Sequence, residues 1–268
     1  MSNGEKGSVL LLAIWVLALL GFVAASLSFR QSMTLKLAEY PWDELRMREI
    51  ARTAVCVGAV AWRKQTGASL DLKDQTTADG SFTLHAEDES ARVNLNKASP
   101  QSLEQLWGSH AGVVADLLRR RTARSFRSVE ELLLVNGMTW DILKDIRDNI
   151  TLYTSGAVNI NTASAEVLTA LGLDAGVVAK IIALRNGPDG FFMQVGEILP
   201  KLKDRFFLSD RETDSLSGIL KENRLTTRSE ACRFRILVRL KDGSARRYSV
   251  VTPTAGSSDH PLLWREVL

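Results

Sequence analysis

An unbroken apolar run lies close to the start of the chain. It extends over residues 8–29, and Arg30 is the first charged residue after it. About twenty apolar residues, each rising about 1.5 Å, form a helix of roughly 30 Å, which is enough to cross the hydrocarbon core of a bilayer. The pattern therefore predicts a transmembrane helix over residues 8–29.

A second helical pattern follows the apolar run. From Trp42 onward, apolar residues recur at spacings of three to five, and charged residues fill the other faces of the same stretch. This periodicity predicts an amphipathic helix that continues to about Thr66. One face carries small side chains that would let another element pack closely: Ala51, Ala54, Gly58 and Ala61.

Strand patterns occur on both sides of a long central block. Residues 81–86 alternate between apolar and polar side chains, which predicts a strand. The preceding stretch, residues 67–80, has turn chemistry and is predicted to be a loop.

The strand pattern returns after the central block. Residues 233–240 and 246–251 alternate around the tight-turn pair Asp242-Gly243, and residues 261–268 suit a last strand. A two-stranded sheet is only marginally stable in water. We therefore expect the early and late strands to form one antiparallel sheet on the preceding helix.

The central block, residues 97–223, has a helical pattern and contains an internal repeat. The stretch 93–99 (VNLNKAS) corresponds to 158–164 (VNINTAS), and each ends in a serine that suits a helix N-cap, Ser99 or Ser164. Further pairs keep the same order: Arg121 with Arg185, Phe126 with Phe192, and Glu131 with Glu197.

These patterns together predict an α+β fold. A long N-terminal helix would pack on a small antiparallel sheet, and a large all-α domain would be inserted within that unit. The predicted division comprises a leader, a transmembrane helix, the first part of a helix-and-sheet domain, the inserted helical domain and the C-terminal strands: residues 1–7, 8–29, 30–96, 97–223 and 224–268.

Composition narrows the class of protein. The chain has 268 residues, of which 45% are hydrophobic and 24% charged, so its soluble part can bury an ordinary core. The net charge of +3 is too small to indicate a dedicated nucleic-acid binder. Cys56 and Cys232 stand far apart, outside any metal-binding spacing, and either a disulfide or two small buried thiols would suit them.

No pattern of catalytic residues is present in the sequence. The three histidines, His85, His110 and His260, are scattered, and nucleophile-elbow, zinc-protease and phosphate-loop motifs are absent. We therefore expect a protein that is not an enzyme. Two acidic stretches, residues 87–89 and 210–214, could supply oxygen ligands, but such linear clusters are expected to be solvated, and no metal ligand is assigned.

Three features in a fixed order resemble a minor pseudopilin of the type II secretion system, of the kind called protein K of the general secretion pathway. The first is Lys6-Gly7 directly before Ser8 and the apolar run. The second is the acidic stretch 87–90 leading into Arg92-Val-Asn-Leu-Asn96, and the third is the large insertion before a C-terminal hairpin. The resemblance covers nearly the whole chain.

The resemblance implies a processed membrane protein. A prepilin peptidase would cleave between Gly7 and Ser8, and the apolar helix would remain as a single span of the inner membrane with the soluble part in the periplasm. The fifth residue after the cleavage site, a glutamate in major pseudopilins, is here Leu12. A carboxylate in a bilayer is costly unless paired, so Leu12 suits a subunit at the filament tip with no neighbour above it.

The resemblance also implies partners and a role. The chain would cap the tip of the pseudopilus, help to initiate the filament and support export across the outer membrane. The face with Ala51, Ala54, Gly58 and Ala61 would pack against I-type and J-type minor pseudopilins. Contact with the secretin or a secreted substrate is a further implication. Calcium is implied by the family alone, with no ligands assigned in this sequence.

Other interpretations remain open. The two copies in the central block resemble degenerate helix-hairpin-helix units, which suits a membrane-anchored DNA receptor for competence. Neither Trp107–Gly112 nor Leu171–Gly176 keeps the compact Gly-apolar-Gly form, Asp174 would oppose a phosphate, and the basic run 119–127 suits a solvated helix end, so we expect no nucleic acid. A minor pilin of a type IV pilus would share the leader and the sheet. An uncleaved anchor, or a secretory signal cut near Ala25-Ser26, is the alternative for the N-terminus.

Overall fold

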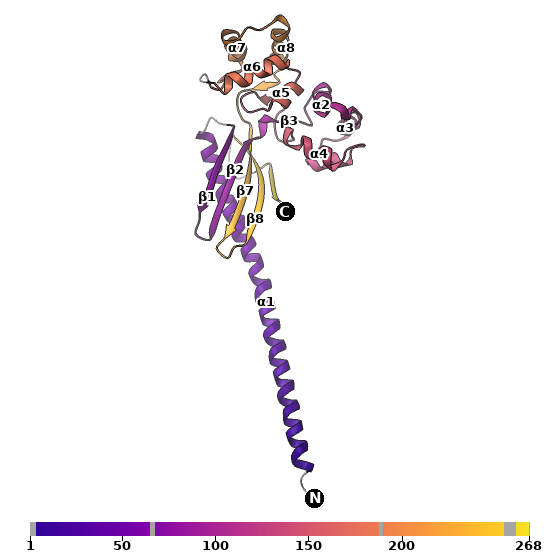
Figure 1. Cartoon of the computed structure of the whole chain (residues 1–268), viewed down its shortest axis with the longest axis vertical. Helices are drawn as coiled ribbons and strands as arrows, with labels where there is room; N and C mark the ends of the chain where they lie inside the picture. The colour runs from indigo at the N-terminus through magenta and orange to yellow at the C-terminus, as the bar shows by residue number, and fades with distance from the viewer. Residues whose placement is uncertain (1–3, 65–67, 188–189, 255–260, 268) are drawn as a thin grey trace. The chain divides into compact units, whose positions relative to one another are not determined.

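The computed structural model describes residues 4–64, 68–187, 190–254 and 261–267. The chain forms two compact units, Met1–Ile50 and Ala51–Leu268, and one helix, α1 (Gly4–Lys64), runs through both (Figure 1). The two predicted helical stretches are therefore one continuous helix. The predicted domain boundaries follow a different division and stay predictions.

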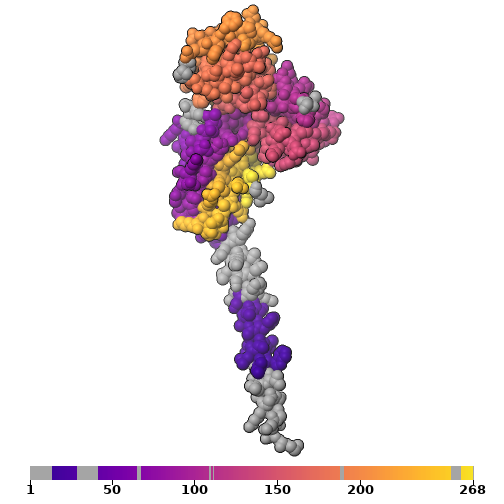
Figure 2. All heavy atoms as spheres, in the orientation of Figure 1, coloured from indigo at the N-terminus to yellow at the C-terminus, as the bar shows by residue number. Residues whose placement is uncertain are grey.

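The first unit exposes an apolar stretch of α1. Figure 2 shows residues 14–28 as an indigo segment, and Trp15 and Phe22 are each 73% exposed. Within the part of the chain that the structure describes, no helix combines the length and the apolar character needed for a membrane crossing. The transmembrane helix over residues 8–29 stays a prediction.

The second unit contains one five-stranded antiparallel sheet in the order β1-β2-β7-β8-β9 (Figure 1). Its strands are β1 (Ser69–Thr76), β2 (Gly80–Asp88), β7 (Ala231–Leu240), β8 (Ala245–Pro253) and β9 (Leu263–Val267). β2 pairs with β7 in a regular register from Gly80 opposite Leu240 to Asp88 opposite Cys232. The structure thus confirms that the early and late strands share one sheet.

Strand β1 corrects the prediction of a loop over residues 67–80. Residues 69–76 pair with β2, and the register is interrupted between Leu72 and Gln75. β1 is an edge strand in which only Leu70 and Leu72 alternate with polar residues, and its last four residues are polar and exposed, so its apolar pattern is short. The predicted turn is real, because the Thr77 backbone N donates to the Gly80 carbonyl at 2.8 Å.

The sheet packs one face on the last turns of α1. Leu84 and Phe234, from the two central strands, are 0% exposed, and Ala51 and Ala54 of the helix are also 0% exposed. Gly58 lies against the same two sheet residues: a Cβ there would lie 2.7 Å from Leu84 Cδ1 and 3.0 Å from the Phe234 ring. Glycine at this position is what allows the helix to approach the sheet so closely.

The insertion is built from short helices between β2 and β7. They are α2 (Pro100–Trp107), α3 (Ala111–Ala123), α4 (Trp140–Ile146), α5 (Ala165–Ala170), α6 (Ala175–Arg185), α7 (Ile198–Arg205) and α8 (Asp210–Lys221). Buried apolar residues between Val93 and Leu225 form one connected core in this region. The insertion therefore has a core of its own.

The insertion is not purely helical. β3 (Val93–Asn94) pairs in parallel with β4 (Ile150–Thr151), and β5 (Val158–Asn159) pairs in parallel with β6 (Leu225–Thr226). Each pair begins one copy of the repeat. Its buried valine brings a backbone segment into the interior, where the N–H and C=O groups need partners. The expectation of an all-α insertion is corrected to this extent.

Candidate functional site

The acidic segment Glu87-Asp88-Glu89 lies where the sheet passes into the insertion. β2 ends at Asp88, and a short 3-10 turn, η1 (Glu89–Ala91), follows it. Asp88 caps this turn, because its Oδ1 accepts a hydrogen bond of 2.8 Å from the backbone N of Ser90. Asp88 is 2% exposed and Glu89 is 0% exposed, so the expectation that this segment is solvated is wrong.

Glu89 has all of its acceptor positions occupied. Arg233 of β7 binds it in two places, Nη2 to Oε1 at 2.6 Å and Nε to Oε2 at 2.8 Å. Arg92 Nη1 donates to Oε2 at 2.5 Å, and Thr151 Oγ1 of β4 donates to Oε1 at 2.6 Å. A carboxylate accepts about four hydrogen bonds, so Glu89 is saturated. It joins η1, the sheet and the first copy of the repeat.

The electrostatics of Glu89 favour the charged form. Burial alone would raise the pKa of Glu89, but the hydrogen bonds and charge of Arg233, together with the charge of Arg92, outweigh burial, so the pKa lies below its usual value. Arg233 responds in the complementary sense: burial lowers its pKa, whereas Glu89 raises it by more. Glu89 therefore remains ionised at neutral pH.

Glu87 extends this network on the exposed side. Its Oε2 lies 2.6 Å from Arg92 Nη2 and 3.2 Å from Arg235 Nη2. Arg235 also contacts Asp148 Oδ1 at 3.3 Å, and Arg92 Nε donates to the Asp148 carbonyl at 2.8 Å. Burial raises the pKa of Glu87, but Arg92 and Arg235 lower it by more. The end of the first copy is thereby tied to both central strands.

Asp88 connects the same turn to the second copy of the repeat. Its Oδ2 accepts from Asn159 Nδ2 at 2.7 Å and from Thr162 Oγ1 at 2.6 Å. Two neighbouring carboxylates therefore hold different copies: Glu89 holds the first and Asp88 holds the second. We call residues Glu87, Asp88, Glu89, Arg92 and Arg233 the acidic junction.

The acidic junction predicts a specific pH dependence of stability. The pKa values of Glu87 and Glu89 are lower in the folded chain than their usual value of about 4.3, so the folded chain binds fewer protons than the unfolded chain. The free energy of unfolding should stay nearly constant above about pH 5 and fall as the pH drops below about 4. Urea unfolding between pH 7 and pH 3 measures this, and Glu89→Gln should flatten the slope. An equal slope in that variant would contradict the assignment.

The two copies of the repeat make the same hydrogen bonds. Asn96 Nδ2 donates to the Phe126 carbonyl at 2.9 Å, and the Phe126 N donates back to Asn96 Oδ1 at 2.9 Å. In the second copy Asn161 Nδ2 donates to the Phe192 carbonyl at 2.9 Å, and the Phe192 N donates back at 2.8 Å. The internal repeat found in the sequence is therefore a repeat of structure.

The matched arginines behave in the same way. Arg121 Nη1 donates to the carbonyls of Leu95 and Ala98 at 3.0 and 2.7 Å. Arg185 Nη1 donates to the carbonyls at the matching positions after β5, Ile160 and Ala163, at 2.9 and 2.7 Å. These arginines close the turn before α2 and α5. The likeness of each copy to a helix-hairpin-helix unit stays a prediction.

The hairpin of the second copy is occupied by carboxylates. Asp174 caps α6 by accepting from the Gly176 N at 2.9 Å. Glu212 of α8 lies so close to Gly176 that a Cβ there would collide with it, and Lys180 Nζ lies 2.6 Å from the same Glu212 carboxylate. A phosphate at this helix start would meet two negative charges.

Three arginines of the basic run 119–127 form ion pairs within the chain. Arg119 and Arg120 both pair with Asp116, and the Asn136 backbone N donates to the same carboxylate at 2.8 Å. The Asn136 hydrogen bond and the two arginines hold the pKa of Asp116 well below its ordinary range. Arg124 lies 3.5 Å from Glu131. Two carboxylates, Asp116 and Glu131, thus offset part of the positive charge of the run.

The small-residue face of α1 is used within the chain. Ala51 and Ala54 are fully buried, Gly58 packs on Leu84 and Phe234, and Ala61 is half-buried. In this structure these residues face the chain's own sheet, and the contact of this face with I-type and J-type minor pseudopilins stays a prediction. Exposed apolar side chains lie on other positions of the helix, with Val57 42% and Val60 53% exposed.

Other predicted residues take no part in the junction. Gly7, Ser8 and Leu12 belong to α1, but their side chains lie outside the described residues. Cys56 and Cys232 are both free, so the disulfide is not formed. Cys56 is exposed rather than buried, whereas Cys232 is buried and burial raises the pKa of its thiol.

The calcium that the family resemblance implies stays a prediction. Among the described residues, no group of three or more His, Cys, Asp or Glu side chains converges on a common position. Calcium requires six to eight oxygen ligands. The oxygens of Glu89 are already taken by arginines and a threonine.

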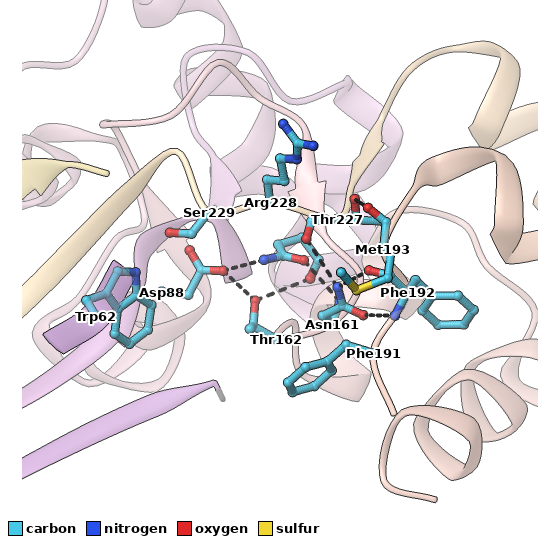
Figure 3. A pocket seen from close by; sticks show the side chains of 11 residues that line it. Trp62, Asp88, Asn161, Thr162, Phe191, Phe192, Met193, Thr227, Arg228 and Ser229 are labelled. Carbon is cyan, nitrogen blue, oxygen red and sulfur yellow. Dashed lines mark hydrogen bonds between the residues drawn. The ribbon is translucent and has the colours of Figure 1, made fainter. Parts of the chain in front are cut away.

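A cavity of about 240 Å³ adjoins the acidic junction on the side of the second copy (Figure 3). Asp88 lies in its wall with Asn159 and Thr162. The remaining lining residues come from the end of α1, from the turn after β5, from the loop before α7 and from the segment before β7: Trp62, Asn161, Phe191, Phe192, Met193, Thr227, Arg228 and Ser229.

Sequence reasoning missed the arginines of the acidic junction. Glu89 and Arg233 are 144 positions apart, so no local pattern joins them. One signal was available: β7 alternates, and its polar face carries Arg233 and Arg235 next to an acidic strand end. Opposite charges on neighbouring strands of one sheet would have pointed to the pairing.

Comparisons with known proteins agree with these observations. Residues 158–203 match the family model described as type II secretion system (T2SS), protein K. The matched segment starts at β5 and reaches into α7, so it contains Asn159, Asn161 and Thr162. No curated protein matches the sequence.

A solved structure has a similar fold. One chain of the crystal structure of the GspK-GspI-GspJ complex from the enterotoxigenic Escherichia coli type 2 secretion system is similar with a TM-score of 0.61 and 15% sequence identity. The similarity covers 88% of this chain and 99% of that chain. The match of residues 158–203 confirms the resemblance to protein K of the type II secretion system, and the solved structure confirms the mixed fold of helix and antiparallel sheet.

Proposed function

We propose that this chain is a K-type minor pseudopilin of a type II secretion system. It assembles with I-type and J-type minor pseudopilins, caps the tip of the periplasmic pseudopilus, helps to initiate the filament and supports protein export across the outer membrane. The observation that carries the proposal is the similarity of fold over 88% of the chain to a protein solved in a GspK-GspI-GspJ complex. The match of residues 158–203 to protein K supports it. In this role the chain is structural and performs no catalysis.

The proposed assembly surface is the exposed apolar side of α1 within the second unit. Val57 and Val60 lie one helical turn apart on it, and Cys56 is exposed beside them. Exposed valines on a helix are suited to contact with the helices of other pseudopilins. Contact with the secretin or with a secreted substrate would then fall to the insertion.

Val60→Arg should abolish most of the assembly. A buried guanidinium without a partner is costly in a helix–helix contact, so co-purification of the full-length chain with the I-type and J-type proteins should fall at least about tenfold. Leu134→Arg is the matched control, because Leu134 is 65% exposed on the insertion. If the folded Val60→Arg chain co-purified as well as the unsubstituted chain, this side of α1 would not be the assembly surface. If the unsubstituted chain itself formed no complex, the proposed function would be rejected.

The proposed membrane attachment rests on the N-terminal segment. A prepilin peptidase would cleave between Gly7 and Ser8, and the apolar helix would anchor the mature chain in the inner membrane. With leucine at position 12, the tip subunit would carry no unpaired carboxylate in the membrane. The exposed apolar residues between positions 14 and 27 support an anchor.

The mature N-terminus should be Ser8. Mass spectrometry of the chain isolated from membranes measures it directly, and Gly7→Val should leave the chain unprocessed, because the peptidase reads that glycine. A mature start near Ser26 would instead indicate an ordinary signal peptidase and contradict the anchor.

DNA binding is not favoured by the contacts of the described residues. The start of α6 carries Asp174 and Glu212, and Arg119 and Arg120 share Asp116. A minor pilin of a type IV pilus would share the sheet and the leader, and co-purification with secretion partners separates it from the proposed function.

A further inference from the structure

The cavity beside the acidic junction has one unusual wall. Asp88 is 2% exposed, and its three hydrogen bonds come from neutral donors: the backbone N of Ser90, the Asn159 amide and the Thr162 hydroxyl. Figure 3 shows the bond from Thr162 as a dashed line to the Asp88 carboxylate. No lysine, arginine or histidine among the described residues forms an ion pair with it. Glu89, the next residue, forms ion pairs with two arginines. Asp88 is thus a buried negative charge with hydrogen bonds but without a counter-charge.

Aromatic rings make up much of the remaining wall. Trp62, Phe191 and Phe192 line the cavity with Asp88. The face of an aromatic ring attracts a cation, most strongly where water is excluded. A buried carboxylate beside aromatic faces is the combination that binds an ammonium group.

The size of the cavity limits the ligand. A cavity of roughly 150 Å³ admits one benzene molecule. The cavity here, about 240 Å³, admits a single long side chain rather than a folded element. Met193 lies in the lining and is 67% exposed, so it offers an apolar surface to an alkyl stem that enters from solvent.

The positive charge at the rim of the cavity predicts the direction in which one substitution changes ligand binding. Arg228 is exposed and lines the cavity, and Figure 3 shows its guanidinium pointing away from Asp88. It would repel a bound cation and attract a bound anion. Replacing Arg228 should therefore strengthen the binding of a cation and weaken the binding of an anion.

We propose that this cavity binds the side chain of a lysine from a partner protein. The ammonium group lies near the Asp88 carboxylate and the faces of Trp62 and Phe191, and the alkyl stem lies against Met193. The inference rests on the cavity alone and does not require the proposed function, because the lining residues would bind lysine in whatever assembly the chain joins.

The test measures binding of small probes to the full-length chain in detergent by NMR shifts of the tryptophan indole and phenylalanine ring signals. Nα-acetyl-lysine methylamide should bind, while the norleucine analogue, which lacks the ammonium, should bind at least about tenfold more weakly. The glutamate analogue should not bind. Free 1,5-diaminopentane should bind no more tightly than the lysine probe, and tighter binding would overturn the assignment to a protein side chain in favour of a free amine.

Three variants make the inference falsifiable even if one fails to fold. Asp88→Asn should weaken the binding of the lysine probe at least about tenfold, and Phe191→Leu should weaken it about threefold. Arg228→Ala should strengthen the binding of this probe about twofold. Phe207→Leu is the control, because Phe207 is 87% exposed outside the cavity, and it should change nothing. Equal binding of the lysine and norleucine probes, or weaker lysine binding by Arg228→Ala, would overturn the proposal. If Asp88→Asn does not fold, the Phe191 and Arg228 variants decide.

Discussion

Glu89→Gln is expected to lower the free energy of unfolding by about 3–5 kcal/mol. The glutamine keeps the volume of the side chain but replaces one acceptor oxygen with an NH₂ donor and removes the negative charge. Arg92 and Arg233, whose side chains are 8% and 17% exposed, would then be partly buried cations facing a donor. Breaking a buried ion pair costs more than the pair contributes, because the remaining charge keeps its desolvation penalty.

Urea unfolding followed by tryptophan fluorescence measures this loss at pH 7. With a slope of about 2 kcal/mol per M, the midpoint should fall by roughly 1.5–2.5 M. Glu222→Gln is the matched control: its carboxylate is 64% exposed and lies 3.4 Å from Arg224, so the change should stay within about 0.5 kcal/mol. Equal effects of the two substitutions would show that the acidic junction does not stabilise the chain.

The sequence predicted the elements whose periodicity comes from a buried face. The alternation of residues 81–86 and 233–240 gave β2 and β7, because each strand buries every second side chain on α1. The repeat was equally visible, because the same asparagine and arginine must close the same turn in both copies. Edge strand β1 was not predicted, because its apolar alternation is limited to Leu70 and Leu72 and its other side chains are polar and exposed.

The acidic junction could be located in the sequence but not understood from it. Residues 87–90 were part of the resemblance to the pseudopilin family, yet their burial depends on arginines from β7 and hydroxyl and amide groups from both copies. Such partners come together only when β2 pairs with β7 and the insertion between them folds. For the same reason, a stripe of small residues on α1 predicted close packing without showing whether the neighbour is another protein or this chain's own sheet.

Gly58→Leu is expected to distinguish these two possibilities, with a loss of about 2–3 kcal/mol in the free energy of unfolding. The Cβ alone would lie 2.7 Å from Leu84 Cδ1 and 3.0 Å from the Phe234 ring, and both residues are 0% exposed, so neither can move aside without disturbing the core. Leucine favours a helix over glycine by roughly 0.8 kcal/mol, which offsets only part of the cost.

The matched control is Gly218→Leu. Gly218 also lies in a helix, α8, but a Cβ there would meet nothing within 4 Å, so the same substitution should stabilise the chain by roughly 0.5 kcal/mol. Opposite signs at two helical glycines follow only if Gly58 faces the chain's own sheet. If Gly58→Leu instead left unfolding unchanged and abolished co-purification with the I-type and J-type proteins, Gly58 would face a partner helix. The sheet would then have to lie farther from α1 than the contacts of Gly58 with Leu84 and Phe234 allow.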